Sequence, residues 1–198
     1  MLSIKLSFLQ ISPKVWSDDN HLYARTAKVY RLLCLFFYSR TVIIDRIKKH
    51  IEVKTKAYWF VTSKRYIPFN DIKYIDVAKI ETMSLILRTG ATPETWYVQI
   101  VRKNKPFREL LFTFNGDGGA DETYDYLPFF DFTGMQYEKA LSYAELVSKY
   151  TGAQLFRDTK IEYNIKVDHY KCLKCGHISP SKTRCMYCGS PEMEKFTI

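Results

Sequence analysis

Four of the five cysteines stand in two matching pairs near the C-terminus. The pairs read Cys-Leu-Lys-Cys-Gly and Cys-Met-Tyr-Cys-Gly, and nine residues separate them. Two residues between thiolates let both sulfurs turn toward one point, and the glycine after each pair permits the left-handed turn that closes such a knuckle. Two facing knuckles supply four soft ligands in a tetrahedral array, which suits Zn²⁺. The spacing therefore predicts a metal site formed by Cys172, Cys175, Cys185 and Cys188.

A site of four thiolates is coordinatively closed, because it leaves no position for water or substrate. We therefore expect one structural zinc ion, which supplies much of the folding free energy of a segment of about thirty residues. Iron is a chemical competitor, since a rubredoxin-like site has the same four-sulfur geometry. The remaining alternatives are two disulfides, four unligated thiols, or a Cys₃His site that includes His169 or His177.

This stretch resembles the zinc ribbons that are appended to many bacterial and eukaryotic proteins, over about residues 170–198. In that family the ribbon binds nucleic acid or docks onto another protein, so the resemblance implies a binding role. The candidate nucleic-acid contacts are Lys171, Lys174, Lys182 and Arg184. These four cations also fit a second role, which is to offset the double negative charge of a Zn(Cys)₄ centre.

The composition is that of a soluble globular protein with a basic surface. Hydrophobic residues make up 46% of the 198 residues, and the net charge of +9 favours anionic partners such as nucleic acid, anionic lipid or an acidic protein face. We find no segment apolar enough to span a bilayer and no signal peptide. Paired metal-ligand cysteines favour a reducing interior, so we predict a cytoplasmic protein. The fifth cysteine, Cys34, lies in an apolar run and is expected to be a small buried hydrophobe.

Alternating apolar and polar residues predict strands through most of the chain from residue 29 to residue 114. Ile51, Val53 and Thr55 alternate with charged residues, which is the period of a half-buried strand. Further extended runs are expected at 29–38, 41–47, 72–77, 83–87, 96–101 and 110–114. The next segment, 136–151, carries apolar side chains at helical spacing, and Gly152 provides a C-cap. The sequence therefore predicts a mainly β protein with one amphipathic helix.

Three segments fit this pattern less well. Residues 1–26 show no clear periodicity, although a polar stretch within them could form a turn. Residues 116–134 are acidic and aromatic and contain no Lys or Arg, so we expect a long loop. Tyr58, Trp59 and Phe60 could stack on bases, but aromatic residues near strands more often belong to the core, and we assign them to the core.

The stretch from residue 51 to residue 77 resembles the start of bacterial pleckstrin-homology-like domains. The features that carry the resemblance are the alternating strand at 51–56, the phrase Ile-Pro-Phe-Asn-Asp-Ile at 67–72, and Ile75. The helix is similar to the one that plugs the open end of that barrel. The resemblance covers about residues 28–152 and implies an antiparallel barrel or sandwich capped by a C-terminal helix. It implies no enzymatic activity, because that family is a scaffold for binding lipid head groups, peptides or proteins.

These observations divide the chain into four parts. We expect an N-terminal segment at 1–26, a pleckstrin-homology-like β domain at 27–152, a connector at 153–168 and the zinc ribbon at 169–198. The connector suggests that the ribbon and the β domain have separate cores.

The segment from Arg25 to Arg65 contains eleven lysines and arginines but only two acidic residues. In pleckstrin-like barrels the first strand pair presents phosphate-binding cations, so the resemblance implies an anion-binding face. The candidate residues are Arg46, Lys48, Lys49, Lys54 and Lys56. The alternative is a solvated strand face, since outward lysines protect any exposed strand. The acidic stretch at 117–131 could also fold over these cations and mask them.

The sequence contains no recognisable catalytic constellation around its four histidines. We therefore expect a non-catalytic binding or adaptor protein without a small-molecule substrate, rather than an enzyme. Its expected partner is another protein or an anionic membrane. The alternative is a nucleic acid bound by the basic residues of the ribbon and of the strand face.

Overall fold

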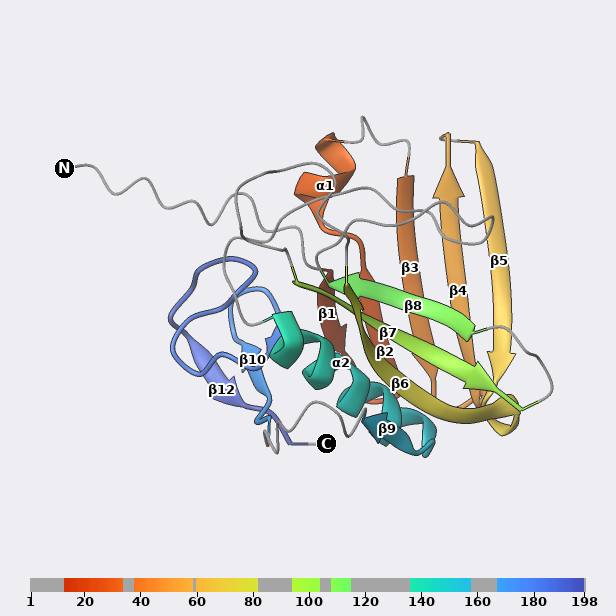
Figure 1. The fold of residues 1–198 in the computed structure, drawn as a ribbon. Coiled ribbons are helices and arrows are strands. Elements are labelled where there is room, and N and C mark those ends of the chain that lie inside the picture. The colour runs from red at the N-terminus through yellow and green to blue at the C-terminus, as the bar shows by residue number, and fades with distance from the viewer. Residues whose placement is uncertain are drawn as a thin grey trace.

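The computed structural model describes residues 13–33, 38–58, 60–81, 94–103, 108–114, 136–157 and 167–197. Over these residues the protein has two larger sheets, one long helix and a small C-terminal sheet (Figure 1). The predicted mainly β class is confirmed. Of the two expected forms, the barrel is not found, because the two larger sheets do not close on each other.

The first sheet holds five antiparallel strands in chain order. They are β1 (Lys14–Ser17), β2 (His21–Arg25), β3 (Tyr38–Asp45), β4 (His50–Ala57) and β5 (Val61–Pro68). Alternate residues point into the core, so Leu22, Val42 and Ile51 are buried and their neighbours form an outer face. The polar stretch does form the β1–β2 turn, where the Asp18 carboxylate accepts hydrogen bonds from the N–H groups of Asn20 and His21.

The second sheet has the order β8-β7-β6-β9. Its strands are β6 (Ile72–Glu81), β7 (Glu94–Arg102), β8 (Arg108–Phe114) and β9 (Leu155–Arg157). A 3₁₀ turn at Phe69–Asp71 leads from β5 into β6. Strand β9 returns after the helix and pairs in parallel with β6, whereas the other strands of this sheet pair antiparallel.

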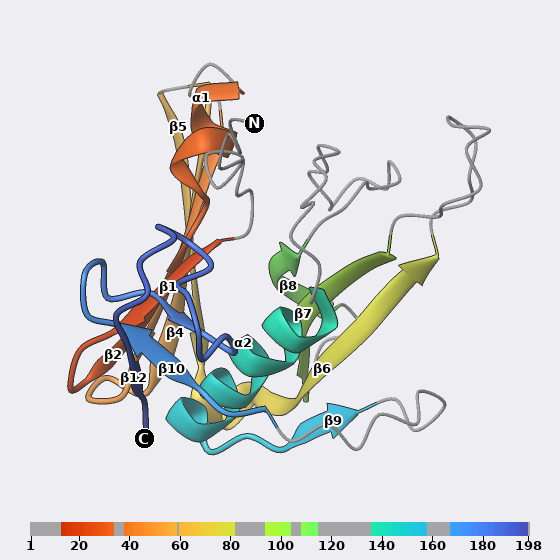
Figure 2. The same cartoon turned by 90° about the vertical axis from the view of Figure 1, so that its left-hand side faces the viewer.

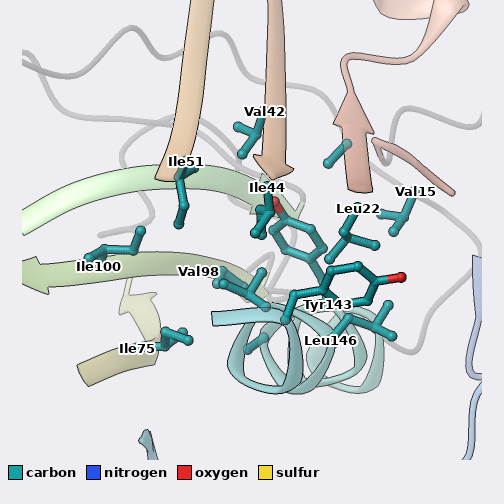
Figure 3. Packing of buried hydrophobic residues seen from close by; sticks show 14 of the residues in the cluster. Val15, Leu22, Val42, Ile44, Ile51, Ile75, Val98, Ile100, Tyr143 and Leu146 are labelled. Atoms are coloured by element: carbon teal, nitrogen blue, oxygen red, sulfur yellow. The ribbon is translucent and has the colours of Figure 1, made fainter. Parts of the chain in front are cut away.

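Helix α2 (Gln136–Thr151) lies between the two sheets, as Figure 2 shows. Its Tyr143 and Leu146 join one buried cluster with Ile44 of the first sheet and Val98 of the second (Figure 3). The predicted helix is confirmed, and its buried surface is wider than the predicted stripe because sheets flank it on two sides.

The ends of this helix follow local rules. Gly152 has a φ of 74°, and its N–H donates to the Ser148 carbonyl, which is the C-cap that the sequence predicts. In the first half of the helix Lys139 is also buried.

The C-terminal ribbon has the strand order β11-β10-β12. Its strands are β10 (Tyr170–Cys172), β11 (Ile178–Ser179) and β12 (Met193–Lys195). Ile178 belongs to the same buried cluster as the two large sheets, and β11 contacts both β1 and α2. The ribbon thus shares the main core, which differs from the separate core that the sequence suggested.

Two local expectations differ from the structure. The run at 29–38 begins as a helix, α1 (Lys28–Leu33), because an apolar run without alternation does not distinguish a strand from a helix. Strand β5 was not predicted, because it is exposed on both faces except at Ile67 and so lacks apolar alternation. The predictions for 83–87, for 116–134 and for Cys34 lie outside the described residues. Within the described part of the chain, no helix is long and apolar enough to cross a membrane.

Candidate metal centre and basic surfaces

The four predicted cysteines meet in the ribbon. All four sulfur atoms lie within 4.8 Å of one another. The Sγ atoms of Cys172 and Cys188 are 3.6 Å apart, and those of Cys175 and Cys185 are 3.7 Å apart. A tetrahedral site with metal–sulfur bonds of about 2.3 Å has edges of about 3.8 Å. The cysteines are free thiols rather than disulfides, so this arrangement can hold a metal ion.

The backbone builds each half of the site as the spacing predicts. Gly176 and Gly189 have φ angles of 71° and 73°, in the left-handed region that glycine adopts without strain. Their N–H groups donate to the carbonyl of the first cysteine of each pair, at 2.8 and 2.9 Å. The N–H groups of Tyr187 and Cys188 also point at Cys185 Sγ, at 3.4 and 3.5 Å. Such donors orient the sulfur and stabilise its charge.

Burial disfavours the charged form of these thiols. It raises the pKa of Cys175 to about 11 and also raises the pKa of Cys185. At Cys172 burial acts in the same direction, but hydrogen bonds from the Cys175 N–H and the Cys188 thiol outweigh it, so the pKa of Cys172 is lowered. A metal ion that binds here displaces the remaining protons, and its positive charge stabilises thiolates that burial alone disfavours.

Neither nearby histidine belongs to the cysteine cluster. His177 Nδ1 lies 3.1 Å from the backbone nitrogen of Val15, and burial lowers the pKa of this histidine to about 3. His169 Nε2 lies 3.0 Å from the Ser142 carbonyl oxygen, and burial lowers its pKa as well. Both rings are therefore neutral groups that fix the ribbon onto β1 and α2, and the Cys₃His alternative finds no support.

Tyr187 connects the cysteine cluster to the first sheet. The centroid of its ring is 5.5 Å from Lys14 Nζ and 5.5 Å from the centroid of the His177 ring. The same Lys14 Nζ is 5.4 Å from the centroid of the Trp16 ring. A cation is attracted to the face of each ring. Tyr187, which lies within the second cysteine pair, therefore contacts strand β1 through Lys14.

The structure divides the five predicted strand cations between the two ends of the first sheet. Arg46, Lys48 and Lys49 lie in the β3–β4 turn, whereas Lys54 and Lys56 lie in the second half of β4. At about 3.3 Å per residue, the strand separates Lys49 from Lys56 by about 23 Å. The five residues therefore do not form one anion site.

Two cations of the β3–β4 turn, Arg46 and Lys48, have partners within the protein. The Arg46 guanidinium lies 4.5 Å from the centroid of the Tyr150 ring, and its Nη2 is 3.4 Å from the Lys149 carbonyl oxygen near the end of α2. Lys48 Nζ is 3.7 Å from the buried Asp45 carboxylate, and a hydrogen bond from the Lys48 N–H lowers the pKa of Asp45. Arg46 and Lys48 therefore contribute to contacts within the protein, and anion binding at this exposed turn stays a prediction.

The opposite end of the sheet is the β4–β5 tip, which we define as Tyr58, Phe60 and Val61. Tyr58 is 64% exposed, Phe60 is 82% exposed, and Val61 is 48% exposed. The assignment of Tyr58 and Phe60 to the core is therefore wrong, and Trp59 lies outside the described residues. Tyr58 has a φ of 49°, so the chain turns here and carries its aromatic side chains past the end of the sheet.

Three lysines, Lys54, Lys56 and Lys64, lie on the two strands that this tip connects. Lys54 on β4 is directly opposite Lys64 on β5, and Lys56 is opposite Thr62. Residues directly opposite each other in an antiparallel pair share a face, so the three lysines all lie on the outer face of the sheet. Lys64 was not among the predicted site residues because its strand shows no apolar alternation.

The four ribbon cations occupy different environments. Lys174, Lys182 and Arg184 are exposed, whereas Lys171 is partly buried on β10, where Glu194 is its cross-strand partner. Their contacts to nucleic acid stay a prediction.

A small cavity lies where α2 meets the ribbon, beside Lys139, His177 and Ser179. Its volume is about 20 Å³, which suits roughly one water molecule. This cavity is too small for an organic substrate.

Comparison of the chain with protein-family models, with curated proteins and with solved structures yields no significant match. Its function is therefore inferred from the geometry of the molecule.

Proposed function

We propose that this protein is a non-catalytic binding module that attaches to an anionic membrane surface through the β4–β5 tip, while one zinc ion holds its ribbon in place. The observation that carries the membrane assignment is the 82% exposed side chain of Phe60, which stands beside Tyr58 at the end of a lysine-bearing hairpin. Water disfavours such an apolar side chain, whereas the interface of a bilayer accepts it.

The two kinds of side chain at this end match the two layers of an anionic membrane surface. Aromatic side chains with a polar end, such as Tyr58, prefer the boundary between head groups and acyl chains. Full burial of a Phe side chain contributes about 1.5–3 kcal/mol, and each lysine near an anionic surface contributes about 1 kcal/mol. Stable attachment to a membrane needs more than one such contribution. Here the tip supplies apolar burial, and the three lysines supply electrostatic attraction.

Helix α1 adds an apolar group at the same end of the sheet. It lies at the same end of the first sheet as the β4–β5 turn in both views (Figures 1 and 2), and Leu32 on this helix is 60% exposed. The strand register also places α1 at this end of the sheet. Tyr38, which begins β3 soon after α1, is opposite Ala57 at the end of β4. A membrane plane across this end of the molecule meets both elements.

Zinc suits the cysteine cluster because Zn²⁺ accepts tetrahedral sulfur ligands and a closed four-thiolate site needs no open position. Free thiols fit a reducing compartment such as the cytoplasm. The ribbon contacts β1 and α2, so the role of the metal is to hold these contacts together rather than to react.

The succession of two sheets and one helix agrees with the pleckstrin-homology-like resemblance, although the sheets stay open. Fold analogy does not identify a partner, so the membrane assignment depends on the tip. A protein that docks on the same tip is the other outcome that an experiment must distinguish.

The test is sedimentation of the purified protein with vesicles that contain phosphatidylserine. The Tyr58→Ser/Phe60→Ser double variant should bind at least tenfold more weakly, since it removes apolar burial worth 1.4 kcal/mol or more. Replacing Lys54, Lys56 and Lys64 by glutamine should remove about 3 kcal/mol of electrostatic attraction and most of the salt dependence.

Leu173→Ser is the matched control, because Leu173 is 63% exposed and lies on the ribbon, away from the tip. It should bind vesicles like the wild type. If the wild type does not sediment with anionic vesicles, or if the tip variant binds as well as the Leu173 variant, the membrane assignment is wrong and docking to a protein becomes the better hypothesis.

A further inference from the structure

The register of the first sheet brings distant basic residues into one line across all five strands. Lys14 on β1 is opposite Arg25 on β2, and Arg25 is opposite Thr41 on β3. Thr41 is in turn opposite Lys54 on β4, which is opposite Lys64 on β5. Because directly opposed residues share a face, these five side chains form one row on the outer face. We call it the cationic row, and at about 4.8 Å per strand it is about 19 Å long.

The cationic row contains two direct like-charge pairs, Lys14 with Arg25 and Lys54 with Lys64. Like charges opposite each other destabilise a sheet. Among the described residues, no carboxylate forms an ion pair with any of these four cations. A bound polyanion with negative charges spaced along a line relieves this repulsion.

The next row along the strands is largely aromatic. It runs from Trp16 through Tyr23 and Ile43 to Glu52 and Tyr66. Trp16 and Tyr23 are stacked, with ring centroids 5.2 Å apart and an angle of 9° between the rings. At the other end Tyr66 is 56% exposed. Glu52 is the single acid of this row.

This outer face is open in the described part of the molecule. Helix α2 packs on the opposite side of the sheet, as Figure 2 shows. Arg25, Lys64 and Tyr66 are exposed, and Trp16 and Lys54 are partly exposed. At the edge of this face the ribbon's Tyr187 contacts Lys14.

We propose that the outer face of the first sheet binds single-stranded nucleic acid, with phosphates on the cationic row and bases against the aromatic row. A line of cations beside aromatic side chains is the combination that recognises single strands, because every base has a face that can stack. A duplex hides its bases, and a broad sheet face does not enter its grooves as a helix or a two-stranded ribbon does. This surface does not include the β4–β5 tip, although its Lys54 and Lys64 are also two of the three lysines that the proposed membrane site uses.

The test is fluorescence anisotropy with a labelled oligothymidylate of about 15 nucleotides, near the upper end of the site sizes of OB folds that bind single strands. The Arg25→Gln/Lys64→Gln variant should bind roughly tenfold more weakly, and the slope of log affinity against log salt should fall by about 1.4 for two lost phosphate contacts. The Tyr66→Ser variant should lose about fivefold or more in affinity through lost stacking, with the salt slope unchanged.

The matched control is Lys73→Gln/Lys103→Gln, which removes the same charge from exposed positions associated with the second sheet. It should bind the oligonucleotide like the wild type. Equal loss in this control, tighter binding of a duplex of the same length, or no binding by the wild type at about 50 mM salt overturns the proposal.

A second variant separates this surface from the membrane site. Tyr58→Ser/Phe60→Ser should lose vesicle binding and keep oligonucleotide binding, so either proposal can fail while the other stands. If Arg25→Gln/Lys64→Gln weakens binding to phosphatidylserine vesicles but leaves oligonucleotide binding intact, the cationic row serves the membrane and the nucleic-acid proposal is wrong.

Discussion

Within each cysteine pair the fold buries the first residue more deeply than the second. Cys172 and Cys185 are buried, whereas Cys175 and Cys188 are half-buried. A metal ion in the site would therefore be bound by one buried cysteine and one half-buried cysteine from each pair. The loss of any one ligand should affect both the ribbon and the core beneath it.

Replacement of Cys188 by serine tests this role. We expect near-stoichiometric zinc in the wild type and far less in the variant by elemental analysis, because three thiolates no longer close the site. Since Ile178 lies in the shared core, the free energy of unfolding of the whole chain should fall by several kcal/mol. Cys34→Ser, which leaves Cys172, Cys175, Cys185 and Cys188 in place, should keep its zinc. Full zinc content or an unchanged unfolding midpoint in Cys188→Ser would contradict this role.

The cluster of four cysteines could be predicted from the sequence, but the exposed tip residues could not. Each cysteine pair and its glycine span five consecutive residues, so the geometry of each knuckle is local. Tyr58 and Phe60 were assigned to the core because aromatic residues near strands usually pack inward. Their exposure depends on where the β4–β5 turn falls, and that in turn depends on β5, a strand without an apolar pattern.

Among the elements, strand β5 shows a conflict between stability and binding. Its Lys64 is directly opposite Lys54, a like-charge pair that opposes strand pairing. Lys64→Glu converts it into an opposite-charge pair and should raise the free energy of unfolding by about 0.2–1 kcal/mol in urea titrations. The same change should weaken binding of both vesicles and oligonucleotide.

Lys64→Gln is the control for that change, because it removes the repulsion without adding an attraction. It should stabilise the protein less than Lys64→Glu does. A loss of stability in Lys64→Glu relative to Lys64→Gln would mean that these two side chains do not interact as the register indicates.

Long elements with a regular apolar period could be predicted, whereas short or fully exposed strands could not. Strands β3, β4, β6 and β7 bury apolar residues two positions apart, such as Ile75 and Val77 in β6, and the helix α2 has helical apolar spacing with a glycine cap. The short strands β1 and β2 offer too few residues for a period to show. The parallel pairing of β9 with β6 follows from where α2 sits between the sheets, which is a tertiary constraint that no local pattern carries.

At the scale of the whole molecule, the chain carries a net charge of +9, and the cations of the first sheet lie in two different environments. The β3–β4 turn uses Arg46 and Lys48 for contacts within the protein. The β4–β5 end instead leaves lysines beside exposed aromatic side chains. The sequence predicted an excess of cations in this region, but only the strand register separates the cations that hold the fold together from those that are free to meet a partner.

Hydrogen–deuterium exchange of the intact protein, with and without phosphatidylserine vesicles, tests the membrane assignment most directly. Amides buried at an interface exchange more slowly. We predict that vesicles slow exchange in peptides that cover residues 57–64, and that exchange in the β3–β4 turn at 46–49 stays unchanged. Equal protection of both ends of the sheet, or no protection at 57–64 under conditions where the protein sediments with the vesicles, would contradict attachment through the β4–β5 tip.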